Sequence, residues 1–118
     1  ERLMDLPNVP IELRVEAGYK RGNAWENKGD RLKAKSAYWD LYDLFVVEEM
    51  RVQELGKKGQ YWLSRAMFKL AEIFEDEAQL DMAIEFYEKI EALGLLGRAT
   101  ARNRVDQLKR RAPVAEAQ

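Results

Sequence analysis

Neither cysteine nor histidine occurs among the 118 residues of this chain. Their absence excludes disulfides, thiolate nucleophiles, Ser-His-Asp triads, haem-histidine ligation and zinc sites with Cys or His ligands. The acidic residues Glu48, Glu49 and those in 72–77 fit exposed helix faces better than a di-metal bundle site, which uses Glu-x-x-His pairs. We therefore expect no enzymatic activity, no catalytic residues, no metal site and no cofactor.

An excess of charge is also missing, because 20 Lys and Arg residues stand against 21 Asp and Glu residues. A net charge of −1 gives no electrostatic reason to expect a nucleic acid or an anionic membrane as partner. No uncharged run exceeds six residues, far below the ~20 of a membrane-spanning helix. The sequence thus predicts a soluble chain without membrane insertion. Its localisation stays unknown, since a chain without cysteine fits the cytoplasm and the periplasm equally.

Proline is present only at positions 7, 10 and 113, and Ile, Val and Thr together number 12. This composition predicts an all-α fold. Glycines mark the ends of apolar periodicities and divide the chain into five predicted helices: 10–28, 30–55, 60–76, 81–93 and 96–111. Asp30 and Asp81 are the predicted N-caps of the second and fourth helices. We expect a single domain over residues 1–112 and a flexible tail at 113–118.

Two segments share a pattern of small, aromatic and aliphatic residues. The first contains Gly22, Trp25, Ala34, Tyr38 and Leu41, and the second contains Ala71, Phe74, Ala83, Tyr87 and Ile90. The spacing between successive members is identical in both segments. Each segment places a small and an aromatic residue before a turn and three packing residues after it, which is the order in which two antiparallel helices interlock.

This pattern resembles the tetratricopeptide repeat, a helix-turn-helix unit of 34 residues. The resemblance implies TPR-like antiparallel helical hairpins, with units at about 15–55 and 60–97 and a C-terminal capping helix at about 96–111. Ala34 and Ala83 lie 49 residues apart, however, so the units are not contiguous in the usual way. The excess falls in a second helix that is long for a globular protein. An unrelated helical bundle, packed by similar stripes, is the alternative.

The resemblance implies a protein-interaction or scaffold module that binds a partner protein or peptide on the concave face of its first helices. It assigns this role to Tyr19, Lys20, Asn23, Glu26, Arg65, Phe68, Lys69 and Glu72. These residues match only part of the basic clamp with which some members hold a peptide's terminal carboxylate, so no clamp is predicted. Because the chain begins at Glu1 rather than Met, we expect a fragment of a longer protein. The form of the repeat suggests a bacterial scaffold.

Self-association is the second hypothesis, with a homodimer formed through the long second helix. The distal half of that predicted helix is apolar and needs a cover, which is either the pair Tyr61 and Trp62 or a second copy. Its apolar residues are Phe45, Val46, Val47, Met50, Val52 and Leu55.

Nucleic-acid binding by the basic segment 98–111, with a net charge of +5, is a third hypothesis. The sequence favours docking of this segment beside residues 72–91, which carry a net charge of −7.

Overall fold

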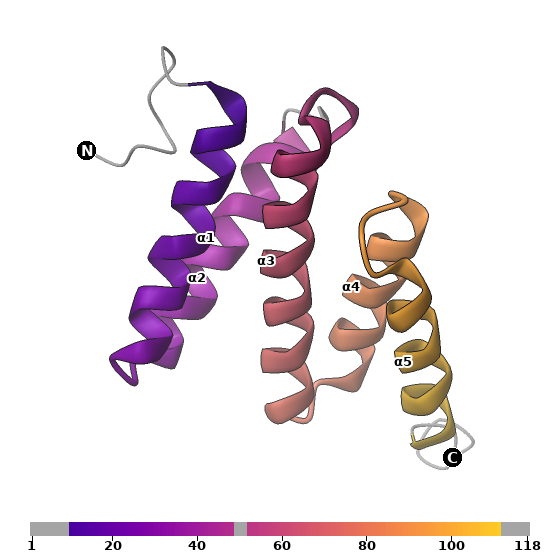
Figure 1. The fold of residues 1–118 in the computed structure, drawn as a ribbon. Helices are drawn as coiled ribbons and strands as arrows, with labels where there is room; N and C mark the ends of the chain where they lie inside the picture. Colours follow the sequence, from indigo (N-terminus) through magenta and orange to yellow (C-terminus); the bar gives the residue numbers. More distant parts are fainter. Residues whose placement is uncertain (1–9, 49–51, 112–118) are drawn as a thin grey trace. The chain divides into compact units, whose positions relative to one another are not determined.

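A computed structural model describes residues 10–48 and 52–111 of the chain. These residues form five α-helices and no strand, which confirms the all-α prediction (Figure 1). The helices are α1 (Ile11–Asn27), α2 (Arg31–Tyr42), α3 (Gly56–Asp76), α4 (Leu80–Ala92) and α5 (Arg98–Arg111). The chain divides into two compact units, residues 1–66 and 67–118, and their boundary falls within α3. The predicted tail lies outside the described residues.

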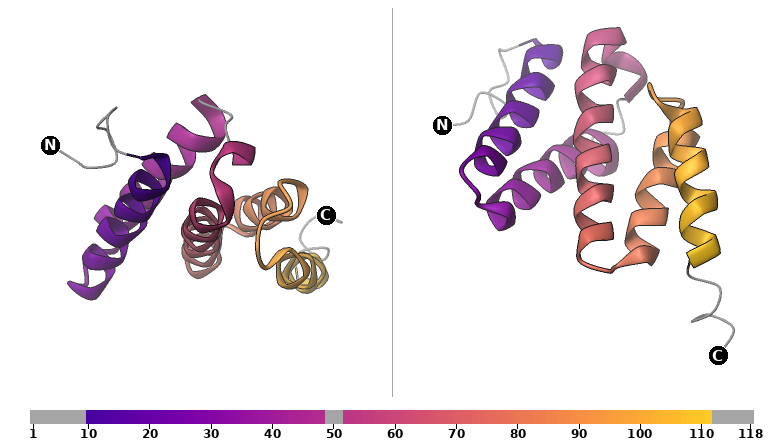
Figure 2. Two further views of the ribbon diagram at one scale, coloured as in Figure 1. Left: turned by 45° about the horizontal axis from the view of Figure 1, so that its top comes forward. Right: turned by 60° about the horizontal axis from the view of Figure 1, so that its bottom comes forward.

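In the first unit, α1 and α2 run in opposite directions and pack on each other (Figure 2). The ring of Tyr38 lies against the backbone of α1 at Gly22, where an added Cβ would come within 2.7 Å of Tyr38 Cδ1. Because Gly22 has no Cβ, α2 can approach α1 closely at this position. Val15, Ala34 and Leu41 complete the buried centre of the pair.

The ends of α1 and α3 have the same geometry. One residue after each C-cap adopts a left-handed backbone conformation, Gly29 at φ 80° and Ala78 at φ 61°. In both turns this residue and the next donate N–H groups to carbonyls of the last helical turn at 2.9 to 3.0 Å. This is the Schellman arrangement, which satisfies carbonyls that the helix leaves unpaired. The two turns lie 49 residues apart, the same offset that separates the two aligned segments.

The long second helix predicted over 30–55 is wrong. The α-helix ends at Tyr42, a π-helical segment continues over Asp43–Glu48, and a short 3₁₀ turn spans Val52–Glu54. Phe45, Val52 and Leu55 are at most 5% exposed, which a straight projecting helix would not achieve. The free energy gained by burying these side chains thus outweighs the cost of leaving regular α-helical geometry. These three side chains are covered within the chain and need no second copy, whereas Val46 is half-buried; Met50 and the side chain of Val47 lie outside the described residues.

Three helix starts also differ from the sequence prediction, and that of α5 is Arg98 rather than residue 96. The α3 helix begins at Gly56 rather than residue 60, and α4 begins after Gln79, so the predicted N-cap Asp81 lies inside its first turn. The reason in α4 is the short turn at the left-handed Ala78, after which a new helix starts directly behind Gln79. Asp30 is the N-cap of α2 as predicted, because its side chain accepts a hydrogen bond from Lys33 N at 3.0 Å.

In the second unit, α5 packs against α4, which confirms the predicted docking of the basic helix beside the acidic one. Arg102 pairs with Glu91 at 3.0 Å, and Lys109 Nζ lies 3.4 Å from a Glu88 carboxylate oxygen. Ala101, Val105 and Leu108 form the buried stripe of α5. Within the described ranges, no helix is long and apolar enough to cross a membrane.

Candidate functional site

The eight predicted partner-binding residues are divided between the two units. The first unit holds four of them on α1 and one on α3, namely Tyr19, Lys20, Asn23, Glu26 and Arg65. The second unit holds Phe68, Lys69 and Glu72, which lie on the later turns of α3. Each unit therefore presents its own cluster of predicted residues.

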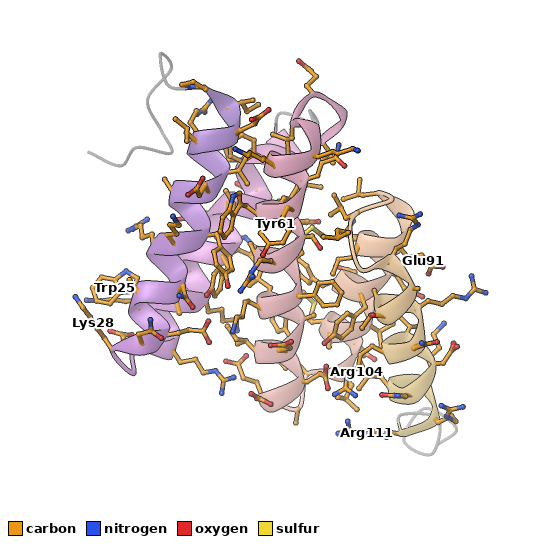
Figure 3. The ribbon with its side chains drawn as sticks, in the orientation of Figure 1. Trp25, Lys28, Tyr61, Glu91, Arg104 and Arg111 are labelled. Atoms are coloured by element: carbon orange, nitrogen blue, oxygen red, sulfur yellow. The ribbon has the colours of Figure 1, made fainter. Side chains whose placement is uncertain are left out.

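Arg65 is the centre of the cluster in the first unit. Its NH1 donates to the Tyr61 hydroxyl at 2.6 Å and its NH2 to the Tyr19 hydroxyl at 3.1 Å. The guanidinium carbon lies 5.1 to 5.9 Å from the ring centroids of these tyrosines and of Trp62. The hydrogen bonds to Tyr19 and Tyr61 raise the pKa of Arg65. The result is an exposed, oriented cation on an aromatic surface; Figure 3 shows the position of Tyr61 on α3.

The other predicted residues of this unit have different roles. Tyr19 is only 3% exposed, so its ring fills space between Tyr38 and Trp62. Glu26 accepts a hydrogen bond from the Tyr38 hydroxyl at 2.6 Å, which ties α1 to α2. Lys20 is exposed, pairs with Glu16 at 2.6 Å, and lies 5.5 Å from the Trp62 ring centroid. Lys20 and Arg65 thus offer charge to a partner, while Tyr19 and Glu26 hold the helices together.

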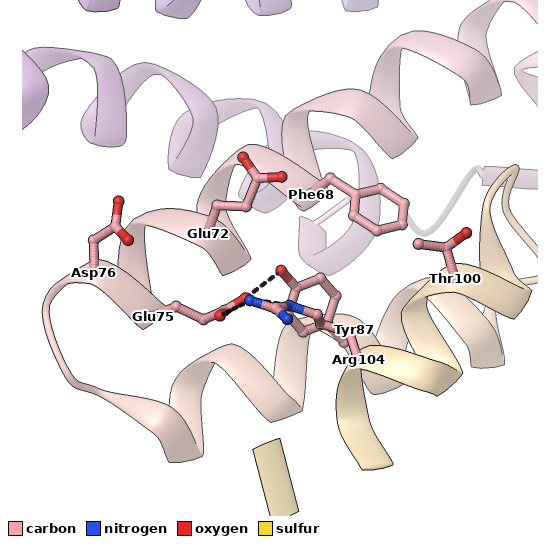
Figure 4. A pocket seen from close by; sticks show the side chains of 7 residues that line it. All are labelled: Phe68, Glu72, Glu75, Asp76, Tyr87, Thr100 and Arg104. Carbon is pink, nitrogen blue, oxygen red and sulfur yellow. Dashed lines mark hydrogen bonds and ion pairs between the residues drawn. The ribbon is translucent and has the colours of Figure 1, made fainter. Parts of the chain in front are cut away.

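A pocket of about 440 Å³ opens in the second unit (Figure 4). It is lined by Phe68, Glu72, Glu75, Asp76, Tyr87, Thr100 and Arg104. The structure therefore brings the predicted residues Phe68 and Glu72 to one cavity with side chains of α4 and α5. Lys69, which follows Phe68 in the chain, is half-buried and does not line it.

Glu75 is the most buried carboxylate of this pocket, with 8% of its side chain exposed. One of its oxygens accepts from the Tyr87 hydroxyl at 2.6 Å and from Arg104 Nε at 3.1 Å, and the other accepts from Arg104 NH2. Burial, and then the hydrogen bond to Glu75, raise the pKa of Tyr87. The same carboxylate raises the pKa of Arg104. A bidentate Arg–carboxylate pair thus links α5 to α3.

The bond between Tyr87 and Glu75 repeats the bond between Tyr38 and Glu26 in the first unit. Both pairs are separated by 12 residues, both bonds measure 2.6 Å, and the pairs are offset by 49 residues in the sequence. Both tyrosines belong to the aligned pattern. Each glutamate comes directly after the aromatic residue of the first helix, which is Trp25 or Phe74. The pattern of aromatic residues therefore marks a recurring hydrogen bond between the first and second helix of each pair.

Tyr87, Thr100 and Arg104 are pocket residues that the sequence reasoning did not select as a site. Thr100 and Arg104 lie four residues apart and come from α5, so only packing places them beside α3. The sequence holds part of this information. Acidic residues gather at 72–91 and basic residues at 98–111, and their opposite charges predict that these segments pack together. Figure 3 shows Arg104 and Arg111 on α5; Arg111 NH1 also approaches Glu75, at 4.0 Å.

No group of three or more His, Cys, Asp or Glu side chains in residues 10–48 and 52–111 is arranged to hold a metal ion. A scan against protein-family models, a search of curated proteins and a search of solved structures each gave no match to this chain.

Proposed function

We propose that this chain is a non-enzymatic protein-interaction module built from TPR-like helical hairpins, with α5 as a capping helix. Three features recur at the same offset in support of this proposal: the aligned residues, the Schellman turns with their left-handed C′ residues, and the Tyr–Glu hydrogen bonds. The partner is a protein or peptide, and the first helices supply the side chains that contact it.

The pocket in the second unit is the observation that carries the proposal. A volume of about 440 Å³ lies in the range of small-ligand sites and is large enough for a side chain of a partner. Phe68 and Tyr87 provide apolar surface, with their ring centroids 5.7 Å apart in an edge-on arrangement. Polar groups of three helices surround these rings. Apolar surface with convergent polar groups is the composition of a recognition site.

A test that does not depend on the charge of the ligand is to fill the pocket. Thr100 lines it and is exposed, so Thr100→Trp places a large ring in the cavity. Asn103, also exposed on α5 but outside the lining, provides the matched control Asn103→Trp. Peptides are first selected from a random display library against the purified chain, and their affinities for the two variants are then measured by fluorescence anisotropy.

We expect the selected peptides to bind Thr100→Trp at least about tenfold more weakly than the parent chain, because steric exclusion removes their contacts with the pocket. Asn103→Trp should bind them within about twofold of the parent. The proposal fails if the library yields no specific peptide, or if the peptides bind both variants as well as they bind the parent.

A further inference from the structure

The first unit contains a cation that no carboxylate neutralises within the described part of the chain. Arg65 is an exposed residue of α3, and no described Asp or Glu side chain forms an ion pair with it. Its hydrogen-bond partners are the uncharged hydroxyls of Tyr19 and Tyr61. In the second unit, by contrast, Arg102 and Arg104 each pair with a glutamate. Because a guanidinium stays protonated at neutral pH, the charge of Arg65 is left to attract an anion from outside the chain.

Hydrogen-bond donors outnumber acceptors around this cation. NH1 and NH2 of Arg65 each carry two hydrogens and each gives one to a tyrosine hydroxyl, so each nitrogen keeps one. A hydroxyl that accepts a bond still has its own hydrogen to donate. Among the described residues, neither Tyr19 nor Tyr61 donates that hydrogen to an acceptor. Tyr19 is only 3% exposed, and buried donors nearly always have an acceptor. An anion supplies the acceptors that this cluster lacks.

Three aromatic rings hold the guanidinium in place. Its central carbon lies 5.1 Å from the ring centroid of Tyr19, 5.5 Å from that of Tyr61 and 5.9 Å from that of Trp62. The Trp62 ring in turn contacts both tyrosine rings, with centroid separations of 5.4 and 5.0 Å. A guanidinium lies over aromatic rings and forms hydrogen bonds in its own plane at the same time. Since Arg65 is already oriented, it loses little conformational freedom when a ligand binds.

The arrangement of the donors indicates the shape of the anion. Two nitrogens of Arg65, each beside one hydroxyl, match an anion with two oxygen atoms, which is how arginine binds a carboxylate. The half-buried rings of Tyr61 and Trp62 offer apolar surface to the methylene groups of an acidic side chain. A carboxylate at a chain end has a polar amide next to its Cα instead of such a stem. The surroundings therefore favour a glutamate or aspartate side chain.

We propose that Arg65, together with the hydroxyls of Tyr19 and Tyr61, binds the carboxylate of a glutamate or aspartate side chain in a partner polypeptide. The guanidinium supplies the charge and two N–H groups, and the hydroxyls supply two further donors. Lys20 is already paired with Glu16 and is not part of this site. The inference goes beyond the proposed function, because it assigns a second site, in the other unit, with a chemistry of its own.

The test uses three labelled alanine peptides. Two are acetylated and amidated at their ends and carry a central glutamate or glutamine, which is its uncharged isostere. The third has no acidic residue but a free C-terminal carboxylate. Their binding to the whole chain is followed by anisotropy and by NMR, through the backbone amides and the Nε–H signal of Arg65. We expect the glutamate peptide to bind roughly threefold to tenfold more tightly than either of the others, with shifts at Arg65 and Tyr61. This preference should decrease as salt is added.

Three variants separate the charge of the site from its geometry. Arg65→Gln should abolish the preference for glutamate. Tyr61→Phe keeps the ring and the net charge but removes a donor and a bond that orients Arg65, so it should reduce the preference by about twofold to threefold. Arg21→Gln is the matched control, because it removes the same charge from an exposed position of α1 outside the cluster, and it should leave the preference unchanged. Circular dichroism confirms that each variant is folded before its affinity is measured.

Equal affinities for the glutamate and glutamine peptides would overturn the inference. Tighter binding of the peptide with the free terminal carboxylate would do the same, as would equal losses in Arg65→Gln and Arg21→Gln. If glutamate is not preferred while Thr100→Trp still excludes peptides from the display library, the inference is wrong and the proposed function stands. If glutamate is preferred as expected but Thr100→Trp excludes no library peptide, the pocket of the second unit fails as a recognition site and the site at Arg65 remains.

Discussion

Ala78 holds a left-handed backbone conformation, at φ 61°, in a turn where the equivalent position of the first unit is Gly29. For residues with a Cβ this conformation costs roughly 1–2 kcal/mol. The turn persists because its hydrogen bonds satisfy the last carbonyls of α3 and allow α4 to start directly afterwards. The hydrogen bonds at the two helix ends therefore offset the conformational strain at Ala78.

Ala78→Gly should stabilise the chain by about 0.5–1 kcal/mol, because glycine adopts the left-handed conformation without the steric cost but loses more entropy on folding. Gly29→Ala is the matched control, since nothing lies within 4 Å of the position its Cβ would take. It should destabilise the chain by about 1 kcal/mol. Urea unfolding measures both changes. Effects of the same sign at the two positions would contradict this account of the turns.

The residues of the pocket illustrate what a sequence does and does not reveal. Phe68 and Glu72 were selected through the resemblance to a helical repeat, and they line one cavity because they lie four residues apart on one helix. Arg104 was not selected, since α5 carries several basic residues and nothing local distinguishes the one that meets Glu75. Charge separation identifies neighbouring helices, whereas the pairing of particular side chains depends on packing distances that the sequence does not state.

At the scale of the helices, several ends were predictable, whereas the irregular segment and the starts of α3 and α4 were not. Pro10 and Asp30 begin α1 and α2 as expected, and Gly94 follows α4 with φ 68°. The residues after Tyr42 retain an apolar helical period and therefore suggest one long helix. Tertiary burial of Phe45 and Leu55 changes the path there, and periodicity alone contains no information about it.

The packing of α3 against α4 provides a prediction for this pair of helices. Ala71 and Ala83 are fully buried, and the aligned pattern places small residues where the two helices cross most closely. Ala83→Leu should cost about 1–3 kcal/mol through overpacking and lower the Tm by several degrees. Ala92→Leu, at an exposed site at the end of α4, should have a much smaller effect. Equal small shifts in thermal unfolding would show that the predicted close crossing is absent.

Charge in the whole molecule nearly cancels, although its parts are strongly charged. The pairs Arg102–Glu91, Lys109–Glu88 and Arg104–Glu75 connect the basic helix to its acidic neighbours, so much of the opposite charge is neutralised within the second unit. The first two pairs are well exposed, and each contributes at most about 1 kcal/mol. The buried position of Glu75 gives the third pair a larger influence on the structure of the pocket.

Both units contain a buried tyrosine bonded to a glutamate, and this shared feature predicts how stability depends on pH. Burial, followed by the hydrogen bond to the glutamate, raises the pKa of Tyr38 and of Tyr87 above the ordinary value of 10.0. Above pH 10, the unfolded chain therefore loses protons that the folded chain retains. Because the unfolded state then binds fewer protons, the free energy of unfolding falls as pH rises, by up to about 1.4 kcal/mol per pH unit for each tyrosine.

Replacing both tyrosines in the double variant Tyr38→Phe and Tyr87→Phe should reduce this alkaline loss of stability. The variant is less stable near neutral pH, by about 0.5–1.5 kcal/mol for each hydrogen bond removed, but its free energy of unfolding should decline less steeply above pH 10. Lysine residues titrate in both proteins, so their contribution largely cancels in the comparison. Urea unfolding between about pH 8 and pH 11 measures the two slopes. Parallel curves would mean that these tyrosines ionise as readily in the folded chain as in the unfolded one.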